Sequence, residues 1–222
     1  MHKGRELMAY QMIHLEIAYR LLEKYDWITN QADFLMGAIA PDAVHFHEKY
    51  EVRLKEHSHL WNCGPKWGIT IDSDKWKKNV LEFWEEHKND DNRDFIAGYC
   101  IHILTDWMND IKIWSPFRNA NMKGDNVEEI YHIYAREAIG SDQWLYQNSG
   151  NSSKIMELLS ESQTYSIAGC VDREDIERQK KHILTEQYKN KESFDISEYR
   201  YCTKEVILAV IDECVEILAE ML

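Results

Sequence analysis

Residues 94–107, DFIAGYCIHILTDW, carry the clearest structural signal in this chain. Apolar side chains at helical spacing surround the stretch on nearly every side, which is typical of a buried helix and not of a surface helix. Two polar residues, His102 and Asp106, lie four positions apart and therefore leave the same face of that helix. Desolvation makes an isolated buried histidine or carboxylate costly. The pair therefore either forms a structural hydrogen bond or faces a common cation.

Composition limits the class of protein. The chain has 222 residues, of which 44% are hydrophobic, and this suits one domain over residues 1–222 with its own core. The formal net charge of −13 disfavours nucleic acid and anionic membrane surfaces as partners. The five cysteines are scattered without a CxxC pair, so we expect reduced thiols and neither a disulfide framework nor a cysteine zinc site.

The sequence predicts a soluble cytoplasmic protein. No run approaches the roughly 18 apolar residues that a membrane-spanning helix needs. The N-terminal stretch has polar residues within every apolar run and no small-residue cleavage site, so it is not typical of a secretory signal. The sequence leaves the oligomeric state open.

Helical periodicity continues along the rest of the chain. Apolar residues at helical spacing predict further helices over residues 5–25, 72–89, 127–139 and 203–222. Gly140 is expected to end the third of these helices, and the helices beyond residues 147–153 are expected to complete the same bundle. Because no stretch alternates polar and apolar residues for long enough to predict a strand, the expected fold class is an all-α multi-helix bundle.

The polar segments between these helices contain most of the remaining candidate site residues. Residues 51–65, EVRLKEHSHLWNCGP, are rich in histidine and predict a functional loop that carries His57 and His59. A proline directly precedes Asp42, which indicates an irregular turn at that position. Residues 111–125 contain a proline and a glycine among polar residues and indicate a connector.

Four short motifs resemble those of the zinc-dependent phospholipase C family, whose wider fold relatives include single-strand nucleases. In chain order they are His14 in the first predicted helix, GAIAPD ending at Asp42, SHLW with His59, and GYCIHILTDW with His102 and Asp106. Each motif contributes an imidazole or a carboxylate, both of which are zinc ligands. The resemblance covers about half of the chain, and it implies the fold of that family and a phosphoric ester hydrolase activity.

The resemblance also implies a ligand set. In that family the counterparts of Asp42, His59, His102 and Asp106 hold one metal ion. The counterpart of Asp106 also bridges to a second ion, which the counterpart of His14 holds. The chain would then bind one or two zinc ions, with manganese or iron as the other metals to consider, and Asp42 would also be the candidate general base. A shared carboxylate brings two cations to about 3.5–4 Å, a separation suited to activating water and stabilising a phosphoryl transition state.

The chain departs from that family in three respects. It has no processed N-terminal tryptophan to complete the second metal site, and no secretory signal. His132 has no glutamate four residues later to build the family's third site, and His182 with Glu186, which have that spacing, lie far beyond the resemblance. The expected substrate is a small phosphomonoester, phosphodiester or phospholipid headgroup, with Trp61 at the pocket mouth and His57 as a substrate contact.

Two functions stay open at the level of sequence. The first is a metal-dependent hydrolase that uses a metal-activated water. The second is a non-catalytic binding or scaffold protein that retains the fold and a structural metal site. A catalytic zinc keeps an open coordination position, whereas four protein ligands close a structural one. His14 also has two readings, as a ligand or as an ordinary core histidine, because its partner in the second site is missing.

Overall fold

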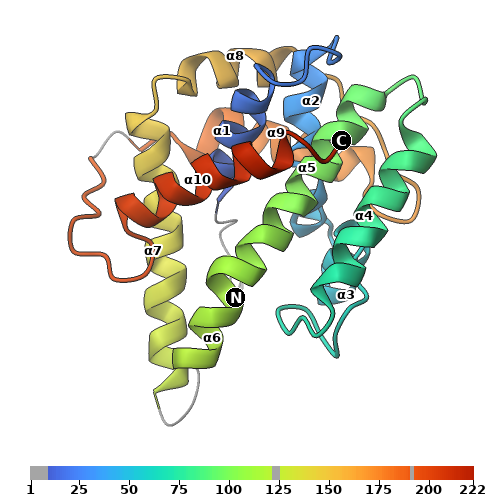
Figure 1. Ribbon diagram of the computed structural model, residues 1–222. Helices are drawn as coiled ribbons and strands as arrows, with labels where there is room; N and C mark the ends of the chain where they lie inside the picture. Colours follow the sequence, from blue (N-terminus) through green and yellow to red (C-terminus); the bar gives the residue numbers. More distant parts are fainter. Residues whose placement is uncertain (1–9, 122–125, 191–192) are drawn as a thin grey trace.

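The computed structural model describes residues 10–121, 126–190 and 193–222, and in these residues the chain is all-α, as predicted (Figure 1). The α-helices are α1 (Gln11–Leu21), α2 (Gln31–Gly37), α3 (Val52–Ser58), α4 (Ser73–His87), α5 (Arg93–Asn109), α6 (Ser115–Asn121), α7 (Val127–Asn148), α8 (Ser152–Glu161), α9 (Arg173–His182) and α10 (Lys204–Leu218). Three other helical segments are the 3₁₀ helix η1 (Ala40–Phe46) and the π-helices η2 (Asp110–Trp114) and η3 (Ile183–Gln187). These described ranges contain no strand, only an isolated antiparallel bridge between Ile167 and Val171.

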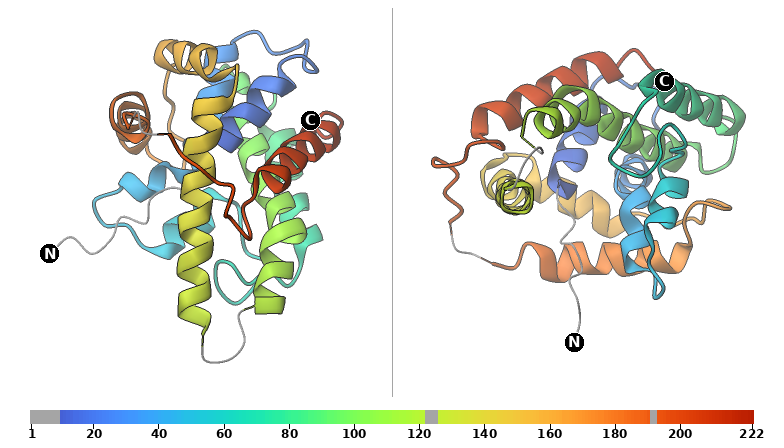
Figure 2. Two further views of the ribbon diagram at one scale, coloured as in Figure 1. Left: turned by 90° about the vertical axis from the view of Figure 1, so that its left-hand side faces the viewer. Right: turned by 90° about the horizontal axis from the view of Figure 1, so that it is seen from below.

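Helices α1 and α5 form the centre of the molecule. α1 contacts α2, α5, α7, α8 and α10, and the view from below shows it inside a ring of other helices (Figure 2). α5 contacts α2, α4, α10 and η1 as well as α1. Every residue of α5 from Asp94 to Trp107 is buried except Asp106, which is partly exposed. The prediction of a buried helix over this stretch is therefore confirmed.

α2 and α5 cross very closely because each contributes a glycine to the crossing. A Cβ atom on Gly98 would lie 1.9 Å from the carbonyl oxygen of Phe34, and one on Gly37 would lie 2.0 Å from that of Phe95. Only glycine leaves room for such a backbone approach. The crossing also brings the carbonyl group of Ala38, at the end of α2, to 2.8 Å from Nδ1 of His102.

The C-terminal helices pack onto this centre. α8 contacts α1 and α2, α9 contacts η1, and α10 contacts α1 and α5. Gln179 of α9 is fully buried, and its amide nitrogen donates to the carbonyl of Ile39 at 2.8 Å and to Oε1 of Gln11 at 3.1 Å. The C-terminal helices and the N-terminal helices thus share one hydrophobic core.

The predicted helices over 72–89 and 203–222 are confirmed as α4 and α10. Asp72 is the N-cap of α4, and its side chain accepts a hydrogen bond from the backbone N–H of Lys75 at 2.9 Å. The helix predicted over 5–25 is α1, which begins at Gln11. The first part of that prediction lies in residues 1–9, outside the described residues.

Two predicted interruptions were wrong. Gly140 does not end a helix, because α7 continues to Asn148; the glycine is buried in the helix, and a Cβ there would meet the hydroxyl of Tyr199 at 1.9 Å. The connector predicted over residues 111–125 is helical up to Asn121, through η2 and α6, and its residues 122–125 lie outside the described residues. Pro116 is the second residue of α6 and follows the π-helix η2 directly, so the helical path through α5, η2 and α6 is irregular next to the proline.

The predicted functional loop at residues 51–65 was also wrong in part, because α3 occupies Val52–Ser58. The inner side of this helix carries few apolar residues, so its sequence shows no hydrophobic period. The irregular turn predicted at Asp42 was wrong as well, since Asp42 lies in the 3₁₀ helix η1.

Candidate metal centre

The five residues predicted as metal ligands come together at the centre of the molecule. The Nε2 atom of His59 lies 3.3 Å from Nε2 of His102, 3.5 Å from Oδ1 of Asp42 and 3.3 Å from Oδ2 of Asp106. Nε2 of His14 lies 3.4 Å from Oδ1 of Asp106. With metal–ligand bonds of about 2.0–2.1 Å, a tetrahedral site has ligand atoms about 3.3–3.4 Å apart. The three distances from His59 are close to this separation, whereas Nε2 of His102 and Oδ2 of Asp106 lie 3.9 Å apart.

These residues form two overlapping groups of three. One group is Asp42, His59 and His102, and the other is His14, His102 and Asp106; within each group the ligand atoms lie within 4.8 Å of one another. His102 belongs to both groups. The residues come from four helical elements. α1 carries His14, η1 carries Asp42, and α5 carries His102 and Asp106, while His59 directly follows α3.

The hydrogen bonds of His59 and His102 prepare both rings to bind a cation. Nδ1 of His102 lies 2.8 Å from the carbonyl oxygen of Ala38, and Nδ1 of His59 lies 3.0 Å from that of Lys55. Since a carbonyl only accepts, we assign the ring proton of His102 to Nδ1, which leaves a lone pair on its Nε2. Nδ1 of His59 also lies 2.9 Å from the hydroxyl oxygen of Ser58, which can donate or accept. Nε2 of His59 lies 3.3 Å from Nε2 of His102, so it can donate a hydrogen bond to that lone pair in the metal-free chain and can act as a second ligand when a cation lies near both atoms. Carbonyl-anchored imidazoles of this kind are the usual arrangement of metal-ligating histidines.

His14 does not share this arrangement. Its Nδ1 atom is buried and has no hydrogen-bond partner among the described residues. If Nε2 held a metal, Nδ1 would carry the proton and would be a buried donor without an acceptor, which is costly. If Nε2–H instead donates to Asp106, Nδ1 carries only a lone pair. The geometry therefore fits one ion held by His59 and its neighbours better than it fits a second ion held by His14.

Asp42 is held firmly from two sides. Its Oδ2 accepts from the side-chain amide of Gln11 at 2.9 Å, and its Oδ1 accepts from Nζ of Lys55 at 3.0 Å. Burial alone would raise the pKa of Asp42, but the Lys55 ammonium and the hydrogen bond with His59 hold that pKa well below its usual range. A carboxylate with a low pKa is a poor proton acceptor. The ligand role of Asp42 therefore fits its surroundings better than the general-base role, which stays a prediction.

Asp106 is the more accessible carboxylate, with a side chain that is 20% exposed. Burial would raise its pKa, but hydrogen bonds with His14 and His59 keep that pKa well below the usual range. Both carboxylates are thus negatively charged at neutral pH and suited to a hard or borderline cation.

The sequence did not single out several residues around the cluster. Lys55 and Gln11 contact Asp42 directly, and Nε2 of His45 lies 3.9 Å from the same carboxylate. Helical spacing would have indicated two of them, since Lys55 precedes His59 by four residues and Gln11 precedes His14 by three. The support that Gln179 gives to Gln11 comes from 168 residues away, so no local pattern could reveal it.

Trp61 and His57 were predicted to contact substrate, and this stays a prediction. Trp61 is only 6% exposed, and its Nε1–H donates to Oγ1 of Thr70 at 3.3 Å. His57 is exposed on α3. The ring of Trp67 lies edge-on to His59 at a centroid distance of 4.9 Å and beneath the Lys55 ammonium, and Nε1–H of Trp76 donates to the backbone carbonyl of His59 at 2.8 Å.

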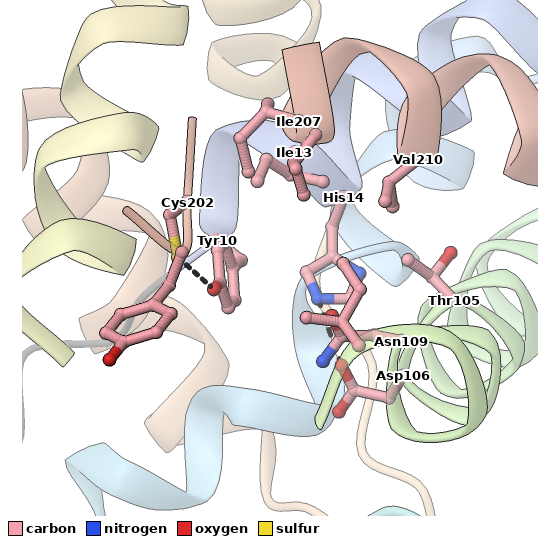
Figure 3. A pocket seen from close by; sticks show the side chains of 12 residues that line it. Tyr10, Ile13, His14, Thr105, Asp106, Asn109, Cys202, Ile207 and Val210 are labelled. Atoms are coloured by element: carbon pink, nitrogen blue, oxygen red, sulfur yellow. Dashed lines mark hydrogen bonds and ion pairs between the residues drawn. The ribbon is translucent and has the colours of Figure 1, made fainter. Parts of the chain in front are cut away.

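A narrow pocket adjoins the cluster at His14 and Asp106 (Figure 3). Half of its other lining residues are aliphatic and come from α1, α10 and η2, among them Ile13, Ile113 and Val210. Its volume of about 20 Å³ is enough for roughly one water molecule. Since Asp106 is the partly exposed ligand candidate, this is the side on which water approaches the cluster.

His182 and Glu186 do not join the cluster. Glu186 lies on η3, is exposed and pairs with Lys189. Neither residue belongs to a group of potential ligand atoms in the described part of the chain. The weaker expectation of a third metal site there finds no support in the geometry.

Acid is expected to destabilise the metal-free protein from about pH 6.5 downward. Burial lowers the pKa of His102 to about 3, and burial with the nearby Lys55 charge lowers that of His45 to about 4. The unfolded chain therefore binds more protons than the folded chain in this interval, and stability falls by up to about 1.4 kcal/mol per pH unit for each histidine. Urea unfolding of chelator-treated protein at about pH 7, 6 and 5 measures this slope. Equal free energies of unfolding at about pH 7 and about pH 5 would contradict this prediction.

None of the described helices combines the length and the apolar character that crossing a membrane requires.

Comparisons with known proteins add no assignment to this geometry. No protein-family model, curated protein or solved structure matched the chain.

Proposed function

We propose that this protein is a metal-dependent hydrolase of phosphoric esters, with zinc as the first metal to test and a small phosphoester as substrate. Asp42, His59, His102 and Asp106 would hold the ion. The observation that carries the proposal is the pair of Nε2 atoms at 3.3 Å, each on a ring whose Nδ1 lies against a backbone carbonyl. The resemblance to the zinc-dependent phospholipase C family supports the same ligand set.

The side chains of the cluster suit such a reaction. A bound divalent cation supplies Lewis acidity, which lowers the pKa of a water and stabilises negative charge on a phosphoryl oxygen. His59 and His102, both fully buried, keep the ligand geometry rigid. Asp106 and Lys55 have partly exposed side chains, at 20% and 18%.

The burial of the cluster also favours a second candidate, a non-catalytic protein with a structural metal. His59 and His102 have no exposed surface and Asp42 is only 5% exposed, as in a site closed by four protein ligands. The two candidates differ in whether a coordination position stays open to water. The absorption spectrum of the cobalt-substituted protein distinguishes them, because an exogenous anion perturbs it only if that position exists.

Metal analysis of protein purified without chelators or a metal-binding tag tests the proposal. We expect at least one equivalent of zinc, manganese or iron, and hydrolysis of aryl phosphomonoesters or phosphodiesters. Asp106→Ala should retain less metal after dialysis and lose hydrolysis, whereas Asp212→Ala, which removes an exposed aspartate paired with Arg20, should behave as the unmodified protein. Absence of metal and of metal-dependent hydrolysis in the unmodified protein would reject the function. Bound metal without hydrolysis, and a cobalt spectrum insensitive to anions, would favour the structural role.

A further inference from the structure

Lys55 places a positive charge inside the candidate metal centre. Its Nζ atom lies 3.0 Å from Oδ1 of Asp42, the oxygen that also faces Nε2 of His59 at 3.5 Å. The ammonium also lies over the ring of Trp67, 5.1 Å from the ring centroid, where a cation–π interaction holds it. The lysine therefore occupies a defined position beside the ligands and does not extend freely into solvent.

The charges of the cluster limit how many cations it can hold. Histidines bind metals as neutral imidazoles, so Asp42, Asp106 and Lys55 together carry one net negative charge. One divalent cation turns this into one net positive charge, which a singly charged anion neutralises. Two divalent cations would leave three positive charges in a buried site, and such an excess is costly. Nδ1 of His14, which has no hydrogen-bond partner in the described part of the chain, points the same way, since a second ion would need that histidine.

We propose that the centre takes a single divalent cation and that the Lys55 ammonium supplies the second positive charge, contacting an anionic phosphoryl oxygen of the substrate. This inference rests on the proposed function and adds a substrate-binding residue to it.

The position of Lys55 explains how it can contact Asp42 in the metal-free centre and a substrate oxygen in the metal-bound centre. Without metal, the ammonium neutralises Asp42. When Oδ1 of Asp42 binds a cation, the ammonium loses that acceptor and has a flexible four-carbon stem with which to reach a new one. Its side chain is 18% exposed, so a substrate oxygen at the edge of the centre can approach it. The backbone carbonyl of Lys55 stays on Nδ1 of His59, so the side chain can turn without disturbing that ligand.

Calorimetric titration with zinc, followed by titration of the zinc-loaded protein with inorganic phosphate, tests the inference. We expect one zinc per chain. Lys55→Met should bind zinc at least as tightly as the unmodified protein, because a competitor for Asp42 is gone. The same variant should bind phosphate at least about tenfold more weakly, the usual loss for one charge-assisted hydrogen bond. Lys55→Arg should keep most of the phosphate affinity.

Lys77→Met is the matched control. Lys77 is also partly buried, and its ammonium lies over a tryptophan ring, 5.0 Å from the centroid of Trp107. It has no carboxylate of the cluster as a partner, so phosphate and zinc affinities should not change. Thermal unfolding of the zinc-loaded variants shows whether each is folded. The number of zinc ions per chain is measured on the unmodified protein, so that part of the test does not depend on the folding of any variant.

The possible results separate this inference from the proposed function. Two zinc ions per chain would overturn the single-cation centre. An unchanged phosphate affinity in folded Lys55→Met, or loss of zinc binding in that variant, would overturn the role of Lys55. Either result leaves the hydrolase proposal intact, whereas a chain that binds no zinc, manganese or iron fails both.

Discussion

Replacement of His102 by alanine is expected to weaken metal binding by about a hundredfold to a thousandfold. His102 is fully buried and is the one residue that the two groups of potential ligand atoms at the centre share. A structural zinc site gains about 10–16 kcal/mol from its ligands, so one of four contributes about 2.5–4 kcal/mol, and 1.4 kcal/mol is a factor of ten. Zinc should raise the unfolding temperature of the unmodified protein and not that of the variant.

The surface provides a matched histidine for comparison. His132 on α7 pairs with Glu128 at 3.7 Å, four residues away, and both side chains are exposed. This pair has the same spacing as His102 and Asp106 but lies outside the cluster. His132→Ala should therefore leave the zinc-dependent shift in unfolding temperature unchanged. If His102→Ala kept that shift, the centre would have to be held by other residues.

Gly98→Ala is expected to destabilise the fold by about 3 kcal/mol or more, at the upper end of overpacking costs. Alanine is the better helix former by about 1 kcal/mol, but its Cβ would lie 1.9 Å from the Phe34 carbonyl oxygen, which belongs to backbone and cannot rotate away. α2 and α5 would have to separate. Because the Ala38 carbonyl at the end of α2 anchors His102, the same change should also weaken metal binding. Urea unfolding and zinc titration measure the two effects.

Gly150→Ala serves as the control, since a Cβ at Gly150 would have no atom within 4 Å. Its free energy of unfolding should stay within about 0.5 kcal/mol of the unmodified protein. If Gly98→Ala were as mild as Gly150→Ala, the two helices would be free to move apart, and the rigid crossing beneath the centre would have to be abandoned.

The periodic apolar pattern was sufficient for the all-α class and for the most regular helices. α4, α5 and α10 follow it because each buries one face or, in α5, nearly every face. The pattern failed at α3, whose inner side faces the polar cluster, and at Gly140, where a glycine serves a contact with Tyr199 instead of a helix end. Local signals mislead where a residue is chosen for a distant partner.

The identity of the five candidate ligands came from short motifs in the sequence, because imidazole and carboxylate groups are recognisable wherever they occur. Their arrangement could not be read there. The carbonyls that orient His59 and His102, the ammonium on Asp42 and the wall contributed by α10 depend on how helices cross. Those crossings are set by close packing between residues far apart in the chain, such as Gly37 with Phe95. Residue types are therefore a property of the sequence, whereas tautomer, charge balance and access to the centre arise only once the helices have packed.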